Sequence, residues 1–472
     1  MNLIQQENQH EGSTDWQLTR IRLDKNDGFR SPSIEGYCSR QSLKAGETLD
    51  IFVSARPAAK FQIEVFRTGY YGGKGARLMA TLGPFDGKEQ AVPEVGAARL
   101  RECRWEKSVS LPIPENWVSG VYIGRLSTLP ASPDQPYWQS YVVFIVKDDR
   151  KADILLQCSD NTWQAYNRWP DTFSLYDNGD PGWVSGPGVD VSFDRPYGKY
   201  RQIYENPQSV GSGEWLCFEF PLAYWLEQQG YDVSYCSNSD MVTPGRGLKC
   251  KAFISAGHDE YWDVKQYHSV TEMRDAGVNV LFLSGNAVCW VSPFRDSSQG
   301  VPGRIITRAA PYGGLARQTK FDDLKRFKDV APGPDEGLLM GAINVIPVNG
   351  GGDWICTQPD HWIFEGTGMK AGDSIPGLIG WEYHGDPAKI EGLEVVAEGT
   401  AFQSGIHPQH WTATIYPGPK HNFVFNAATI FWAQGLSKPP GHMIPWSHWN
   451  RPHGPDKRVQ RITGNLLKRA LR

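Results

Sequence analysis

The chain has 472 residues, of which 40% are hydrophobic and 21% are charged, and its formal net charge is -4. This composition is typical of a globular protein with two or three domains. The slightly acidic balance argues against nucleic acid or an anionic membrane as the main partner. Residues 1–15 are polar and lack the apolar segment of a secretory signal, and no apolar run approaches the ~20 residues of a membrane helix.

The cysteine and tryptophan contents bear on compartment and function. The eight cysteines are scattered and form no Cys-x-x-Cys pair. We therefore expect reduced thiols in a cytoplasmic protein. Eighteen tryptophans are a high number, and aromatic side chains serve both large cores and sugar-binding platforms. A non-enzymatic carbohydrate-binding protein is therefore one alternative.

The N-terminal third is predicted to be all β. Residues 1–30 are expected to be a tail, and residues 48–54 and 61–66 then alternate apolar and polar side chains with the period of a strand. Further strands are predicted at residues 101–111, 120–126 and 139–147. Several short strands at this spacing predict a β-sandwich of immunoglobulin type over residues 31–148, which ends at a charged junction.

The pattern changes in residues 149–472, where strands alternate with helices. Strands are predicted at residues 152–157, 231–236, 252–255 and 278–283. Helices are predicted at residues 218–229 and 263–276, the second with Asp263 as N-cap. This alternation predicts a parallel, doubly wound sheet. Residues 290–405 read as irregular, and the chain closes with strands at 412–416 and 422–425 and a helix at 457–471.

Polar side chains follow two neighbouring strands of that sheet. His258 and Glu260 come directly after the strand at 252–255, and Asn286 follows the strand at 278–283. Ligands of open α/β sheets bind at the carboxyl ends of the strands. His258 and Glu260 would point to the same side if this segment is extended. The sequence therefore predicts one site containing His258, Glu260 and Asn286.

Several motifs occur in a fixed order along the chain. They are Asn161-Thr-Trp-Gln-Ala-Tyr-Asn167, Ser174-Leu-Tyr-Asp177, Ser192-Phe-Asp-Arg-Pro-Tyr197, Gly257-His-Asp-Glu-Tyr-Trp262, Ser284-Gly-Asn286, Phe364-Glu-Gly-Thr-Gly368, Gly377-Leu-Ile-Gly-Trp-Glu382 and Val459-Gln-Arg-Ile-Thr-Gly-Asn465. This ordered set resembles the large (beta) subunit of N,N-dimethylformamidase and its bacterial relatives, over most of residues 31–472. The resemblance implies a glutamine-amidotransferase-like, flavodoxin-like α/β domain in residues 149–472. It also implies a mononuclear iron held by two tyrosines and one glutamate.

Carried over residue by residue, the resemblance implies the metal ligands Tyr166, Tyr176 and Glu260. It implies a catalytic set of His258, Asn286 and Glu382. The spacing between Tyr166 and Tyr176 is shorter than in the amidase, so Tyr197, Tyr200 and Tyr204 remain alternatives for the second phenolate ligand.

These residue types suit the implied chemistry. Phenolate and carboxylate are hard oxygen ligands, and three anionic oxygens would balance Fe(III). The metal would polarise an amide carbonyl and acidify a bound water. His258 or Glu382 would act as general base, and Asn286 would hold the developing oxyanion. The prediction is an iron-dependent hydrolase of the C–N bond of a small or N-substituted amide. Its partner is the small-molecule substrate, and a homo-oligomer or a small accessory subunit stays open.

Two rival sites are considered. His407 and His410 lie three apart, but Pro408 argues against a helix that would bring them to one face. Cys289 lies near Asn286 and could serve a Cys-dependent, amidotransferase-like hydrolase together with His258. No Gly-x-Cys-x-Gly or Gly-x-Ser-x-Gly turn accompanies it.

Overall fold

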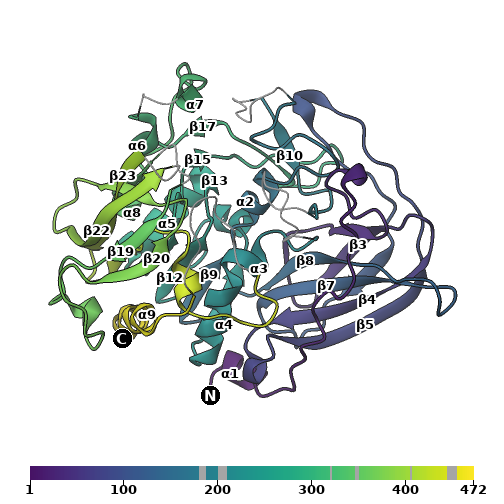
Figure 1. Ribbon diagram of the computed structural model, residues 1–472, viewed down its shortest axis with the longest axis horizontal. Coiled ribbons are helices and arrows are strands. Elements are labelled where there is room, and N and C mark those ends of the chain that lie inside the picture. The colour runs from purple at the N-terminus through teal and green to yellow at the C-terminus, as the bar shows by residue number, and fades with distance from the viewer. Residues whose placement is uncertain (180–187, 200–209, 319–321, 346–349, 404–406, 444–453) are drawn as a thin grey trace.

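The computed structural model describes residues 1–179, 188–199, 210–318, 322–345, 350–403, 407–443 and 454–472. In Figure 1 the N-terminal strands, in purple and blue, lie to one side of the molecule, and the C-terminal strands, in green and yellow, lie to the other. The teal strands of the middle of the chain lie between them. Within the described ranges, no helix combines the length and the apolar character that crossing a bilayer requires.

The N-terminal third forms two sheets that share one core. The first sheet has the order β1 (Glu35–Cys38), β3 (Thr48–Ser54), β6 (Val109–Pro112). The second has the order β2 (Ser42–Lys44), β8 (Gln139–Lys147), β7 (Gly120–Leu129), β4 (Lys60–Thr68), β5 (Ala76–Asp86). Alternate apolar side chains such as Ile51, Ile63 and Leu126 point between the sheets. The strands predicted at 48–54 and 139–147 are confirmed with the same bounds.

The strand predicted at residues 101–111 is wrong over most of its length, because only β6 is a strand. In the preceding segment, the backbone of Glu106 pairs with a side chain instead of with a neighbouring strand. The amide of Gln90 donates to the carbonyl of Glu106 at 2.8 Å and accepts from the backbone N–H of Glu106 at 2.7 Å. This pairing satisfies the backbone groups that a sheet ladder would otherwise satisfy.

Strands β7 and β8 of the five-stranded sheet are buried on both faces. Its second face, with Val121, Ile123 and Val143, belongs to the same core as the strands and helices of the following part of the chain. A fully buried ion pair, with Arg67 Nη2 2.8 Å from Glu227 Oε1, also joins the two parts. This explains why β7 and β8 read as nearly continuous apolar runs rather than as alternating strands.

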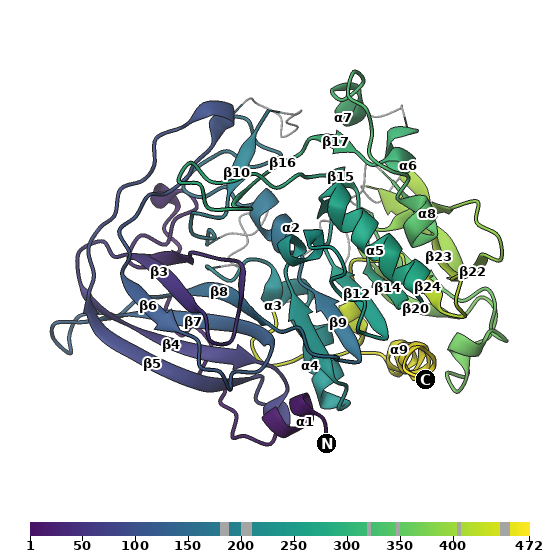
Figure 2. The ribbon, with the colours of Figure 1, turned by 180° about the vertical axis from the view of Figure 1, so that it is seen from behind.

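The rest of the chain is built on a seven-stranded sheet. Its order is β11 (Val233–Cys236), β9 (Ile154–Gln157), β12 (Ala252–Gly257), β14 (Asn279–Ser284), β24 (Phe423–Asn426), β23 (His407–Pro417), β22 (Glu394–Gln403). The first five strands are parallel to one another. Strand β23 runs antiparallel to both of its neighbours, β24 and β22. Helix α5 (Val264–Ala276) packs on one face, and α4 (Phe220–Gln228) and α9 (Lys457–Ala470) belong to the core of the other. Figure 2 shows α5 in front of this sheet.

The helix boundaries follow local chemistry. The carboxylate of Asp263 accepts from the backbone N–H of Lys265 at 2.7 Å, which confirms the predicted N-cap of α5. Gly277, with φ 104°, ends α5 in the left-handed conformation that favours glycine. The helix predicted at 218–229 is divided into α3 (Trp215–Phe218) and α4, with Glu219 between them.

The prediction that residues 290–405 are irregular is wrong for β22, which pairs with β23 along ten residues. Shorter elements in the chain are α1 (Leu3–Glu7), α2 (Asp160–Ala165), β10 (Asp190–Ser192), β13 (Tyr261–Trp262), β15 (Trp290–Val291), β16 (Ile305–Thr307), β17 (Ala310–Pro311), α6 (Gly313–Ala316), α7 (Asp322–Lys325), α8 (Gly337–Met340), β18 (Ala342–Asn344), β19 (Gly352–Ile355), β20 (Ser374–Ile379) and β21 (His384–Pro387). The N-terminal tail is docked, since Ile4 and Trp16 are fully buried.

Candidate active site

The candidate site lies at the carboxyl ends of β9, β12 and β14. The spatial order of the parallel strands reverses between β9 and β12, because the chain passes from β9 outward to β11 and then returns to β12 on the other side. Such a reversal is where open α/β sheets bind ligands. Tyr166 follows β9 through α2, His258 and Glu260 follow β12, and Asn286 follows β14.

Two tyrosines converge on one carboxylate. Tyr166 Oη donates to Glu260 Oε2 at 2.7 Å, and Tyr176 Oη donates to Glu260 Oε1 at 2.8 Å. The two rings stack with their centroids 5.0 Å apart and an angle of 12° between their planes. The backbone supports this arrangement, since the N–H of Leu175 donates to the carbonyl of Ala165 at 2.9 Å. Both phenol oxygens therefore lie within hydrogen-bonding distance of the carboxylate of Glu260.

Two further side chains approach the same carboxylate. Trp290 Nε1 donates to Glu260 Oε1 at 3.0 Å, and Asn286 Nδ2 lies 3.5 Å from that oxygen. Asn286 adopts φ 54°, a left-handed conformation that asparagine tolerates better than most residues. Its amide is therefore held at the site by the backbone, with only a long contact to Glu260.

His258 lies among three carboxylates. Its Nε2 is 2.8 Å from Glu382 Oε2 and 3.2 Å from Glu260 Oε2, while its Nδ1 is 3.1 Å from Glu214 Oε2. Glu382 reaches the site because its backbone crosses Gly285, where a Cβ atom would meet the carbonyl oxygen of Glu382 at 2.2 Å. The structure therefore brings together all six residues that the sequence singled out for the site.

The buried charges shift the acidities of these groups. Burial, followed by the charge of Glu260, raises the pKa of Tyr166 and of Tyr176 well above the usual value. Burial alone would lower the pKa of His258, but the carboxylates of Glu382 and Glu214 outweigh it and raise that pKa well above its usual value. Burial raises the pKa of Glu382 to about 7, against the opposing effect of His258. The raised pKa values of His258 and Glu382 thus belong to two side chains whose nearest atoms are 2.8 Å apart.

The donor set fits a hard cation. Tyr166, Tyr176 and Glu260 offer oxygen atoms that already meet at one carboxylate, and oxygen donors suit hard, highly charged ions. The site also holds a local excess of buried carboxylates, which a cation would balance. A second set overlaps the first, because ligand atoms of His258, Glu260 and Glu382 lie within 4.8 Å of one another. Glu260 belongs to both sets.

The rival sites are less favourable. Cys289 is fully buried, and burial, followed by the charge of Glu260, raises the pKa of its thiol well above the usual value. The thiolate that a cysteine nucleophile needs is therefore disfavoured. His410 lies on the exposed side of β23, where it contacts Asp386 and Glu398, and the side chain of His407 lies outside the described residues.

The alternative tyrosines and the tryptophans can also be placed. Tyr197 packs edge-on against Trp163 with ring centroids 6.3 Å apart, whereas Tyr200 and Tyr204 lie outside the described residues. Most tryptophans within the described ranges are buried, and eight of them are among the largest fully buried side chains. Their number therefore reflects the size of the core, which leaves the carbohydrate-binding alternative without its main support.

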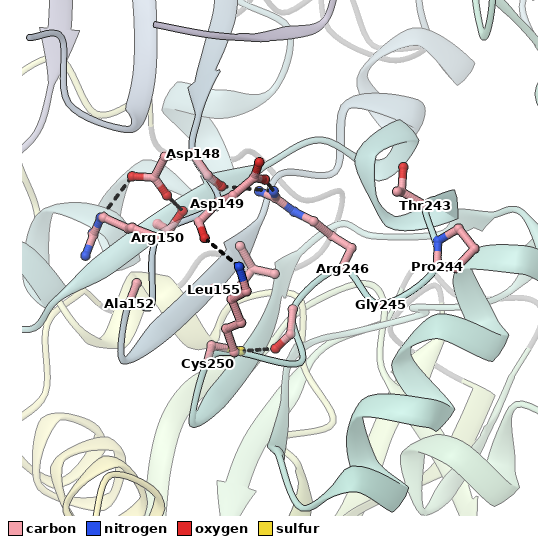
Figure 3. A pocket seen from close by; sticks show the side chains of 13 residues that line it. Asp148, Asp149, Arg150, Ala152, Leu155, Thr243, Pro244, Gly245, Arg246 and Cys250 are labelled. Atoms are coloured by element: carbon pink, nitrogen blue, oxygen red, sulfur yellow. Dashed lines mark hydrogen bonds and ion pairs between the residues drawn. The ribbon is translucent and has the colours of Figure 1, made fainter. Parts of the chain in front are cut away.

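A cleft of about 220 Å³ lies at the other end of the parallel strands, and Figure 3 shows the side chains that line it. It is lined by Ala152 and Cys250, which precede β9 and β12, and by charged side chains of the junction at residues 148–150. Arg150 donates to Asp232 there, and Arg246 donates to Asp149 at 2.7 Å. This cleft lies at the amino edge of the sheet, opposite the edge that carries the candidate site.

The sequence did not point to Glu214, Trp290 or Arg308 as members of the site. Trp290 and Arg308 lie in a stretch that read as irregular, and Glu214 lies in a loop-rich insert. The guanidinium carbon of Arg308 lies 4.3 Å from the ring centroid of Tyr176 and 4.5 Å from that of Trp290. No local periodicity marks these residues, because their role depends on contacts with distant segments.

Comparison with known proteins agrees with the motifs. The family described as N,N-dimethylformamidase beta subunit-like, C-terminal, matches residues 62–445. This match covers most of the chain, from residue 62, which lies within β4, to residue 445, which precedes α9. The chain belongs to this family, as the ordered motifs predicted. No curated protein matches the sequence.

Proposed function

We propose that the protein is an iron-dependent amide hydrolase that cleaves the C–N bond of a small or N-substituted amide. The observation that carries this proposal is the meeting of two phenol oxygens at the two oxygens of the single buried carboxylate of Glu260. Tyr166, Tyr176 and Glu260 would hold one ferric ion. Bound there, the ion would supply Lewis-acid chemistry, polarising an amide carbonyl and acidifying water.

In this proposal His258 and Glu382 handle the proton. During hydrolysis an oxygen–carbon bond forms from water to the amide carbon, and the carbon–nitrogen bond breaks. The proton released by water passes to the pair formed by His258 Nε2 and Glu382 Oε2, which are 2.8 Å apart. The same pair then returns it to the leaving amine nitrogen. A carboxylate whose pKa is raised to about 7 suits both steps, because it can take up and release a proton near neutral pH.

Asn286 is proposed to stabilise the charge that develops on the carbonyl oxygen. Its Nδ2 contacts Glu260 only at 3.5 Å, so that donor remains able to turn to a closer acceptor. The left-handed backbone at Asn286 brings the side chain to the site before the substrate arrives, and donors placed in advance are the most effective in catalysis.

We further propose the fold families and domains that accompany this activity. The two N-terminal sheets would be an immunoglobulin-like domain over residues 31–148, and residues 149–472 would be the catalytic domain. If the five parallel strands are numbered along the chain, their spatial order in the sheet is 2-1-3-4-5. This order matches the flavodoxin-like arrangement and supports a glutamine-amidotransferase-like domain. The proposed partner remains a small-molecule amide.

The proposal is tested by metal analysis of protein purified without chelator, combined with an assay of amide hydrolysis. We expect one iron per chain and a visible colour from phenolate bound to Fe(III), which zinc or magnesium would not give. Removal of the iron should abolish hydrolysis, and its return should restore it. Colourless, iron-free protein that still hydrolyses amides would refute the iron requirement.

A further inference from the structure

The imidazole of His258 is held from behind by a carboxylate that the proposed catalytic set does not include. Glu214 Oε2 lies 3.1 Å from Nδ1 of His258, on the ring edge opposite Glu382 and Glu260. The side chain of His258 is fully buried, and that of Glu214 is only 3% exposed. A buried carboxylate in this position is costly unless it is paired, so the contact with His258 is energetically important.

The chain places Glu214 tightly. It follows a turn in which Gly213 has φ 61° and packs so closely on Trp163 that a Cβ atom would approach the indole to 2.8 Å. The same turn is tied to the N-terminal sheet, because the N–H of Tyr141 in β8 donates to the carbonyl of Val210 at 2.9 Å. Glu214 is the N-cap residue directly before α3, and the backbone N–H of Cys217 in α3 donates to the carbonyl of Glu214 at 2.9 Å.

The ring of His258 is also locked from its faces. Phe218, at the end of α3, packs edge-on against it with centroids 5.7 Å apart, and Tyr166 lies on the other side at 5.1 Å. At Gly257, with φ 67°, a Cβ atom would meet that of Phe218 at 2.5 Å, so α3 sits directly on the end of β12. The segment that carries Glu214 and the strand that carries His258 therefore form one rigid unit.

We propose that Glu214 is a positioning residue of the active site, which accepts the Nδ1–H of His258 and so directs Nε2 toward Glu382 and Glu260. This inference rests on the proposed hydrolase. With Nδ1–H held by Glu214, Nε2 is the only ring nitrogen that can exchange a proton with Glu382. A carboxylate behind a histidine has the same two effects in hydrolases of other folds, where it fixes the tautomer and stabilises the imidazolium.

Loss of the carboxylate should release the tautomer. In the Glu214→Gln variant the side-chain amide can donate to Nδ1, which would move the ring proton to Nε2 and remove the acceptor that faces Glu382. The Glu214→Ala variant removes the carboxylate acceptor behind the ring. The proton-transfer step should therefore slow in both variants, while the iron ligands Tyr166, Tyr176 and Glu260 are untouched.

The test compares these variants with Glu219→Gln. Glu219 lies five residues further along and is also buried, but its carboxylate accepts from Ser159 and from Trp163 Nε1. Burial raises the pKa of Glu219 to about 8, so an amide mimics its neutral form. We expect Glu214→Gln to lower kcat by about 10²- to 10⁴-fold, the range of acid–base catalysis, with little change in KM or iron content. Glu219→Gln should keep the wild-type kcat.

A second readout does not depend on activity. Nitrogen-15 NMR of histidine-labelled, iron-free full-length chain reports the tautomer of His258. We expect a protonated Nδ1 in the wild type and in Glu219→Gln, and an unprotonated Nδ1 in Glu214→Gln and Glu214→Ala. Wild-type kcat in both Glu214 variants, or an Nδ1–H form that persists in both, would overturn the proposal. Failure of the iron hypothesis would show separately, as hydrolysis by iron-free wild type, and would leave the tautomer result intact.

Discussion

The ligand role of Tyr166 can be separated from its packing role by removing only the hydroxyl. The Tyr166→Phe variant keeps the ring, and with it the stacking on Tyr176 at 5.0 Å. It loses one of three proposed protein ligands. Because even a partner that only orients a metal ligand is worth 10- to 100-fold in affinity, we expect iron affinity to fall by more than about 100-fold. Visible colour and hydrolysis should disappear with the iron.

The same substitution has a calculable effect without iron. The Tyr166 hydroxyl donates to the Glu260 carboxylate at 2.7 Å, and a hydrogen bond to a charged group contributes about 1.5–3 kcal/mol. The free energy of unfolding of the iron-free protein should fall by about that amount. Urea denaturation of metal-depleted protein measures it, and elemental analysis of untreated protein measures the iron.

The matched control is Tyr312→Phe. Tyr312 is fully buried, whereas Tyr166 is half-buried, and the hydroxyl of Tyr312 donates to the backbone carbonyl of Trp262 at 3.1 Å. This variant should keep full iron and lose only about 1 kcal/mol of stability. Full iron and colour in Tyr166→Phe, or equal iron loss in Tyr312→Phe, would refute the ligand assignment. Tyr176→Phe and Tyr197→Phe, compared in the same assay, decide which residue supplies the second phenolate.

Three further predictions concern the proton pair, the amide donor and a buried acid. His258→Ala should retain iron and lose about 10²- to 10⁴-fold in kcat, and near-normal turnover would contradict its role. Asn286→Gly removes the amide while tolerating φ 54°, so kcat should fall by about 10²- to 10³-fold with iron and folding preserved; an unchanged kcat would exclude it as an oxyanion donor. The pKa of Glu219 is raised to about 8 in the folded state. Between pH 4.5 and 8 the folded protein therefore binds more protons than the unfolded protein. The contribution of Glu219 to the free energy of unfolding falls as the pH rises through this range. The free energy of unfolding of Glu219→Gln, measured by urea denaturation, should therefore rise relative to that of the wild type by about 1 kcal/mol or more for each pH unit between pH 5 and 7.5. A difference that does not change with pH would contradict a buried, protonated Glu219.

The sequence determined much of the local structure on which the site is built. The apolar run before Gly257 predicted β12, and Asp263 and Gly277 set the two ends of α5 through cap chemistry. These features depend on neighbouring residues, so local pattern and propensity predict them. The ordered motifs also predicted the family, because they preserve the identity and the order of the residues that meet in space.

Local pattern failed where distant groups satisfy the backbone or bury both faces of an element. Residues 101–108 have strand-like composition, but at Glu106 the side chain of Gln90 takes the backbone hydrogen bonds that a neighbouring strand would have taken. The stretch at 394–403 gave no clear signal of a strand, and its pairing with β23 makes it one. In both segments the deciding partner lies elsewhere in the sequence.

Only the tertiary structure decided the composition of the catalytic cluster. His258 meets Glu214 from 44 residues earlier, and it meets Glu382 because Gly285 leaves room for that backbone to cross. Neither contact follows from periodicity, since each depends on how separate loops pack at one edge of the sheet. The sequence supplied the chemical groups, and the fold decided which of them lie close enough to exchange a proton, because proton exchange requires atoms within about 3 Å and that proximity is a property of packing.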